Sequence, residues 1–85
     1  MKTFEYTVKD ELGIHARPAG LLVKEVGKYK SHVSLTKEGK KVDASRLMAV
    51  MSLGVKQGQT VKVEVEGEDE ADAGAGLSAF FKSNL

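Results

Sequence analysis

Four stretches of the chain alternate apolar and polar residues, a pattern typical of strands with one buried face. They span residues 3–8, 32–36, 41–43 and 61–66. The alternation is clearest in the last stretch, where three valines are separated by charged residues. Between the second and third stretches, Glu38-Gly39 predicts a tight hairpin turn. We therefore expect four strands, two of them joined by this hairpin.

A fifth stretch repeats apolar residues at the spacing of a helix. Pro18 is tolerated only in the first turn of a helix, so this helix begins close to His15. We expect Gly27 to end it at about that position. Its apolar stripe consists of Ala19, Leu22, Val23 and Val26.

A short helix follows the third strand. Asp43 or Ser45 is placed to cap it, and Gly54 ends it. Apolar residues lie all round this helix, and one face of a sheet can bury only part of them. If Val50 and Leu53 point inward, an apolar patch is left outside, rich in the methionine that suits surfaces fitting several partners. This patch consists of Leu47, Met48 and Met51. The alternative is that all three residues belong to the core.

The last helix begins at the acidic run Glu68-Asp69-Glu70, since acidic side chains suit a helix N-terminus. Gly74 and Gly76 lie inside it, and each costs about 1 kcal/mol relative to alanine. We therefore expect this helix to be weaker than usual. Its apolar stripe consists of Ala73, Leu77, Phe80 and Phe81.

The predicted order of elements is β-α-β-β-α-β-α, which indicates an α+β fold. Every strand has one polar and one apolar face, so we expect an antiparallel four-stranded sheet with three helices on one face and water on the other. The 85 residues make one small domain, residues 1–85, and no linker, repeat or low-complexity segment interrupts it.

Composition excludes several classes of function. The chain has no cysteine, so disulfides and thiolate metal sites are excluded. Its net charge of +1 gives no general argument for binding nucleic acid. No apolar run has the length of a signal peptide or could span a bilayer. We therefore expect a soluble, cytoplasmic protein that does not insert into membranes.

The segment Gly13-Ile14-His15-Ala16-Arg17-Pro18-Ala19 carries the most specific chemistry. The backbone N–H groups that open a helix have no partner inside the helix and attract anions. A neutral imidazole nitrogen of His15 can attack phosphorus. The N–H groups of Ala16 and Arg17 and the Arg17 guanidinium could then hold the phosphate. This arrangement indicates a phosphohistidine site.

Other interpretations of His15 are weaker. A capping or surface histidine needs no adjacent arginine, and His32, which has none, is interpreted as a plain surface residue. Zinc binding is improbable because no cysteine, second histidine or acidic residue stands at ligand spacing. Hydrolysis by a Ser-His pair would need an acidic group to orient the imidazole, and none is evident nearby. We therefore expect no metal ion and no cofactor.

The same segment and three others resemble the HPr family, the histidine-containing phosphocarriers of the bacterial phosphoenolpyruvate:sugar phosphotransferase system. The other segments are residues 40–43 (KKVD), 47–54 (LMAVMSLG) and 65–70 (VEGEDE). The resemblance runs nearly end to end and implies an open-faced β-sandwich. It also implies a carrier rather than an enzyme: His15 accepts a phosphoryl group on Nδ1 from enzyme I and passes it to sugar-specific IIA domains.

A surface for acidic partners is predicted on the first helix. Plotted at 100° per residue, Arg17, Lys24 and Lys28 fall within roughly 40°, opposite the apolar stripe, with Leu21 on the same side. Resemblance to the family implies that the patch on the short helix contacts enzyme I and IIA domains. The full set of predicted partner contacts is Gly20, Leu21, Lys24, Lys28, Leu47, Met48, Met51 and Ser52. We expect the protein to act as a monomer.

The chain departs from the family pattern at a few positions. Some members carry a regulatory serine at the start of the second helix, where this chain has Arg46, with Ser45 one residue earlier. Leu12 replaces a small polar residue near the histidine, and Gly20 replaces alanine or threonine. We therefore expect no serine regulation. The alternative function is a regulatory binding module, or a dedicated phosphorelay paralogue, that acts through the patch on the short helix.

Overall fold

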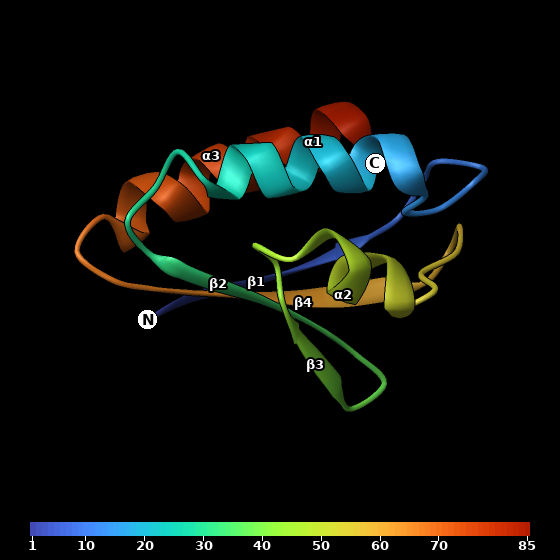
Figure 1. Cartoon of the computed structure of the whole chain (residues 1–85), viewed down its shortest axis with the longest axis horizontal. Helices are drawn as coiled ribbons and strands as arrows, with labels where there is room; N and C mark the ends of the chain where they lie inside the picture. The colour runs from blue at the N-terminus through green and yellow to red at the C-terminus, as the bar shows by residue number, and fades with distance from the viewer.

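The structure, a computed structural model that describes residues 1–85, contains four strands and three helices in the predicted order (Figure 1). The elements are β1 (Lys2–Thr7), α1 (Ala16–Val26), β2 (His32–Lys37), β3 (Lys40–Asp43), α2 (Leu47–Ser52), β4 (Thr60–Glu66) and α3 (Glu70–Asn84).

The strands form one antiparallel sheet in the order β1-β4-β2-β3. Helices α1 and α3 lie side by side over one face of this sheet, and α2 lies beside α1 and β3 (Figure 1). No helix covers the other face. The predicted open-faced α+β architecture is therefore confirmed.

The core lies between the sheet and the helices. The predicted alternation in β4 is present in the structure, since Val61, Val63 and Val65 have no exposed surface. Phe81 of α3 is also fully buried, and its ring meets those of Phe4 and Tyr6 at centroid distances of 5.8 and 5.5 Å. These edge-to-face contacts anchor α3 on β1.

Glycines lie at the hairpin turn and at the ends of α1 and α2, with different backbone conformations. The predicted hairpin is present: Glu38 and Gly39 both have positive φ (49° and 82°), as a two-residue turn between twisted strands requires. Gly54 follows α2 with a φ of 59°, a left-handed conformation that suits glycine. The predicted end of α1 at about Gly27 is confirmed, since the last helical residue is Val26, but Gly27 does not end the helix by a left-handed turn. Gly27 keeps helical angles and its N–H group still donates to Val23 O.

Two further expectations need correction. Ser34, a polar residue of the alternating stretch 32–36 and so expected on the polar face, is buried; β2 is an inner strand, paired with β3 on one side and β4 on the other. Neither Asp43 nor Ser45 caps α2, because the residue at the cap position is Arg46 and the helix has no side-chain cap.

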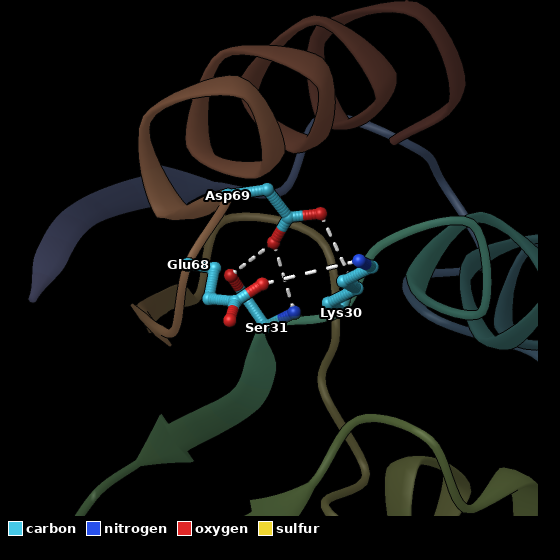
Figure 2. A network of polar contacts seen from close by, with 4 residues as sticks. All are labelled: Lys30, Ser31, Glu68 and Asp69. Carbon is cyan, nitrogen blue, oxygen red and sulfur yellow. Dashed lines mark hydrogen bonds and ion pairs between the residues drawn. The ribbon is translucent and has the colours of Figure 1, made fainter.

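A polar network joins the start of β2 to the start of α3 (Figure 2). The Asp69 carboxylate accepts hydrogen bonds from the Ser31 hydroxyl (2.5 Å) and from the N–H groups of Ser31 and Lys30 (2.9 Å each). Asp69 directly precedes α3, but its carboxylate forms no capping bond because it is used across this turn. Glu68 and Lys30 add a long ion pair of 3.9 Å between exposed side chains, which contributes little.

Candidate functional site

His15 is the residue directly before α1. Its backbone is extended (φ −97°, ψ −173°), its carbonyl oxygen accepts the Ala19 N–H group at 3.0 Å, and it is half-buried. The imidazole forms no hydrogen bond to the N–H groups of the first turn. The role of a helix-capping histidine is therefore not supported, and the ring nitrogens are not committed to the helix.

The loop before His15 is fixed against the segment that follows α2. Gly13 has a φ of 68°, and a β-carbon there would collide with the Val55 carbonyl oxygen and lie 2.8 Å from Lys56 Cα. The next residue, Ile14, is buried and donates its N–H group to the same carbonyl at 3.0 Å. Only glycine fits this close approach, which sets the position of His15.

His15 lies in an open concavity of about 340 Å³ that joins the start of α1 to the end of α3. The N–H groups of Ala16 and Arg17 donate to no backbone carbonyl, and the Arg17 side chain forms no ion pair. Both features leave positive charge available to bind an anion. The residues that line the concavity are Asp10, His15, Arg17, Pro18, Leu21, Ser83 and Asn84.

Three of these lining residues, Asp10, Ser83 and Asn84, were not predicted. Ser83 and Asn84 come from the far end of the chain and no local motif marks them. The end of α3 is held here because the N–H groups of Lys9 and Asp10 donate to Leu85 O, at 2.6 and 2.9 Å. The signal that could have found them is topological: α3 runs in the same direction as β1 and opposite to α1, so its end lies near the start of α1 (Figure 1).

The exposed apolar residues of the predicted partner surface lie on α1 and α2. Met48 is 75% exposed, Leu21 42% and Leu47 41%, while Val50 is fully buried. Met51 does not belong with them, since it is half-buried and packs against the core. The cause is that α2 packs against both α1 and β3, so part of its circumference is covered.

Two polar residues of this surface have partners inside the protein. Ser52 is exposed and donates its hydroxyl to Ala49 O at 2.6 Å. Lys28 lies beyond the end of α1, so a plot at 100° per residue does not give the direction of its side chain. It forms a 3.0 Å ion pair with Glu25, which raises the pKa of Lys28 and lowers that of Glu25. Lys24, within the helix, is exposed and pairs with no carboxylate.

The start of α2 differs from the expectation for Ser45. Its hydroxyl donates to Asp43 Oδ1 at 2.6 Å, and its N–H group donates to the same oxygen at 2.8 Å. The hydroxyl, and then the N–H group, lowers the pKa of Asp43. Ser45 is therefore engaged with a carboxylate and not with the N–H groups of the helix, while Arg46 is exposed.

No three His, Asp or Glu side chains are grouped so that they could hold a metal ion. None of the helices has the length and apolar character needed to cross a membrane.

Comparison with known proteins identifies the family. Residues 2–83 match the family model described as the PTS HPr component phosphorylation site. HPr-C-His from Thermoanaerobacter tengcongensis is 42% identical over 99% of this chain and 94% of that chain, with a TM-score of 0.93.

Two other solved structures show the same fold. The phosphocarrier protein HPr from Bacillus anthracis is 31% identical over 94% of this chain and 95% of that chain, with a TM-score of 0.87. Crh, the catabolite repression containing protein of Bacillus subtilis, is 39% identical over 100% of this chain and 98% of that chain, with a TM-score of 0.79. With the match to the family model, these similarities show that the chain belongs to the HPr family of phosphocarrier proteins.

Proposed function

We propose that this protein carries a phosphoryl group on His15, which it takes from phospho-enzyme I and delivers to the IIA domains of sugar permeases in the cytoplasm. One observation supports the proposal above the others. The imidazole of His15 is uncommitted and lies in a concavity beside Arg17, at the start of α1, where the N–H groups of Ala16 and Arg17 have no backbone acceptor.

The proposed step is a transfer between two nitrogens. The lone pair of His15 Nδ1, in the neutral ring, attacks the phosphorus of a phosphohistidine on the donor. The new nitrogen–phosphorus bond forms as the donor's nitrogen–phosphorus bond breaks, and the donor nitrogen keeps that electron pair. Delivery to an acceptor is the same exchange in the opposite sense, so the phosphoryl group is passed on without oxidation or hydrolysis.

Arg17 and the two N–H groups are proposed to stabilise the charge on the phosphoryl oxygens during transfer. Losing one such donor from a desolvated site typically costs about 2–4 kcal/mol. Asp10 is the only carboxylate side chain that lines the concavity, and its Oδ1 already accepts the Leu12 N–H group at 2.8 Å. The site therefore favours holding a phosphoryl group over activating water against it.

Incubation with enzyme I and phosphoenolpyruvate tests the proposal. The protein should gain about 80 Da in an acid-labile form, the mass of one phosphoryl group. His15→Ala should gain nothing, whereas His32→Ala, which removes an exposed histidine from β2, should behave as wild type. An equal gain in His15→Ala would show that the phosphoryl group is carried elsewhere.

A regulatory binding module is the second candidate. The similarity to Crh, a protein named for catabolite repression, and the exposed Leu47 and Met48 support it. A pull-down that compares His15→Ala with Met48→Glu separates the two functions. If only Met48→Glu loses its partner and His15→Ala still supports sugar uptake, the carrier proposal fails and the regulatory one stands.

We further propose that the carrier acts as a monomer. HPr from Thermoanaerobacter tengcongensis has also been crystallised as a dimer, 42% identical with a TM-score of 0.77, and Crh forms a swapped dimer. Light scattering at a series of concentrations tests the proposal for this chain, and a stable dimer at micromolar concentration would overturn it.

A further inference from the structure

The last turn of α2 is capped from outside the helix by two lysines of the β2–β3 hairpin. Lys37 Nζ donates to Leu53 O at 3.0 Å and to Gly54 O at 3.2 Å. Lys40 Nζ donates to Ser52 O at 3.3 Å. No backbone N–H group donates to these three carbonyls. Because the last carbonyls of a helix carry the negative end of its dipole, the two ammonium groups satisfy acceptors that the helix leaves free.

The helix α2 has few means of its own to stay folded. It is six residues long, which is less than two turns, and isolated helices of this length are not stable in water. It has no side-chain cap, no acidic residue in its first turn and no basic residue in its last turn. Burial of Val50 and Leu53 holds one side of the helix, and the hairpin lysines hold its end.

The placement of the two lysines in the hairpin is itself unfavourable. Lys37 follows Leu35 by two residues, so it lies on the covered face of the sheet with that buried leucine. In the antiparallel register Lys40 is directly opposite Lys37, and like charges at directly opposite positions repel each other. Neither lysine pairs with a carboxylate. The carbonyl groups at the end of α2 are therefore what balances this repulsion.

The capped helix is the one that carries the exposed apolar residues. Met48 and Leu47, 75% and 41% exposed, form the start of α2 and lie less than two turns from the capped carbonyls. Loosening of the last turn therefore changes how both side chains are presented to a partner.

We propose that Lys37 is a positioning residue for phosphoryl exchange, with Lys40 in a weaker, supporting role. Its ammonium group holds α2 folded, and the folded helix presents Met48 and Leu47 to the protein that exchanges phosphoryl groups with His15. Removal of this charge lowers the fraction of molecules that can dock, and the apparent affinity falls in proportion. This inference rests on the proposed function and adds a residue that contacts neither the phosphoryl group nor the partner.

Hydrogen exchange of three variants tests the cap. Lys37→Met keeps the apolar stem and removes the charge, whereas Lys37→Arg keeps the charge. Lys41→Met is the matched control, since Lys41 belongs to the same hairpin but its Nζ lies 3.4 Å from Glu64 of β4. In Lys37→Met the N–H groups of Leu53 and Gly54 should exchange about tenfold faster relative to those of β4, the size expected for one lost hydrogen bond to a charged donor. Lys37→Arg and Lys41→Met should exchange as wild type.

Transfer kinetics test the consequence for docking. Lys37→Met should raise KM for phosphoryl transfer from enzyme I by about two- to fivefold and leave kcat unchanged, because it removes binding and not chemistry. Phosphoramidate, a small donor that needs no docking surface, should phosphorylate His15 at equal rates in wild type and all three variants.

Several results would overturn the proposal. It is wrong if exchange in Lys37→Met accelerates equally in α2 and β4, or not at all, or if KM stays at the wild-type value. It is also wrong if Lys41→Met raises KM as much as Lys37→Met, since net charge alone would then explain the effect. If enzyme I fails to phosphorylate even the wild type, the proposed function fails and the docking role with it, while hydrogen exchange still decides whether Lys37 holds α2.

Discussion

Gly76 of α3 and Tyr29, which follows α1, are in direct contact: a β-carbon at Gly76 would collide with the Tyr29 hydroxyl group. That hydroxyl donates to Glu25 Oε2 at 3.0 Å, and the tyrosine ring packs against the core. The tyrosine cannot move aside without losing this bond. Gly76 is therefore explained by the close packing of α1 and α3, whereas Gly74, two residues earlier, meets only the Lys2 side chain at 3.5 Å.

Alanine at these two glycines should change stability in opposite directions. Gly74→Ala should stabilise the protein by about 0.5–1 kcal/mol through helix propensity alone. Gly76→Ala gains the same propensity but forces Tyr29 to move, and overpacking of this kind typically costs about 1–3 kcal/mol. Urea unfolding of the two variants and the wild type measures both effects. Stabilisation by Gly76→Ala would show that Tyr29 yields freely.

Acid should weaken the network around Asp69. The Ser31 hydroxyl, and then the Lys30 N–H group, lowers the pKa of the Asp69 carboxyl in the folded protein. A carboxyl with a lowered pKa stabilises the fold above its unfolded pKa of about 3.9, and this contribution is lost as the pH falls through the lower, folded value. Wild type should therefore be more stable than Asp69→Asn at pH 7, and the two should converge below about pH 4. Urea unfolding at a series of pH values tests this, and parallel pH curves would contradict it.

The elements were predictable where one periodicity decides the structure. The valines of β4 alternate strictly and are all fully buried, and Pro18 placed the start of α1 within one residue of His15. Local patterns failed where a contact joins distant segments. Ser83 reaches the His15 concavity only because Leu85 is held by the loop after β1, and such a pairing has no period in the sequence.

The partners of individual polar side chains were a second feature that the sequence patterns did not predict. Ser45 stands where a helix cap is expected, but the nearby Asp43 carboxylate competes for its hydroxyl. Lys28 continues the angular pattern of the cationic face of α1, but the helix ends at Val26 and a carboxylate one turn back captures the lysine. In both cases a charged group two or three residues away overrides the regular geometry that the pattern assumes.

Arg17→Ala should slow phosphoryl transfer from enzyme I by about 10²–10³-fold in kcat, the range seen when one donor is removed from a preorganised anion site. Arg17→Lys should recover part of that loss, because lysine keeps the charge but not the forked geometry. Lys24→Ala is the matched control for docking and should act mainly on KM, with a smaller effect at high salt. Rapid-quench transfer kinetics separate these effects, and an unchanged kcat in Arg17→Ala would exclude the proposed role.

Arg46→Ser should restore the regulatory serine that some HPr proteins carry at the start of the second helix, and so create a site for the ATP-dependent HPr kinase of those proteins that the wild type lacks. Arg46 is the exposed residue directly before α2 and offers no hydroxyl. Ser45 does offer one, but it donates to Asp43 Oδ1 at 2.6 Å, and a phosphate on it, with a charge of about −2, would lie against that carboxylate. With kinase and ATP, wild type should gain little acid-stable phosphate, while Arg46→Ser should gain about 80 Da and keep that gain when Ser45→Ala is added. Strong phosphorylation of Ser45 in the wild type would show that the Asp43 contact does not protect it.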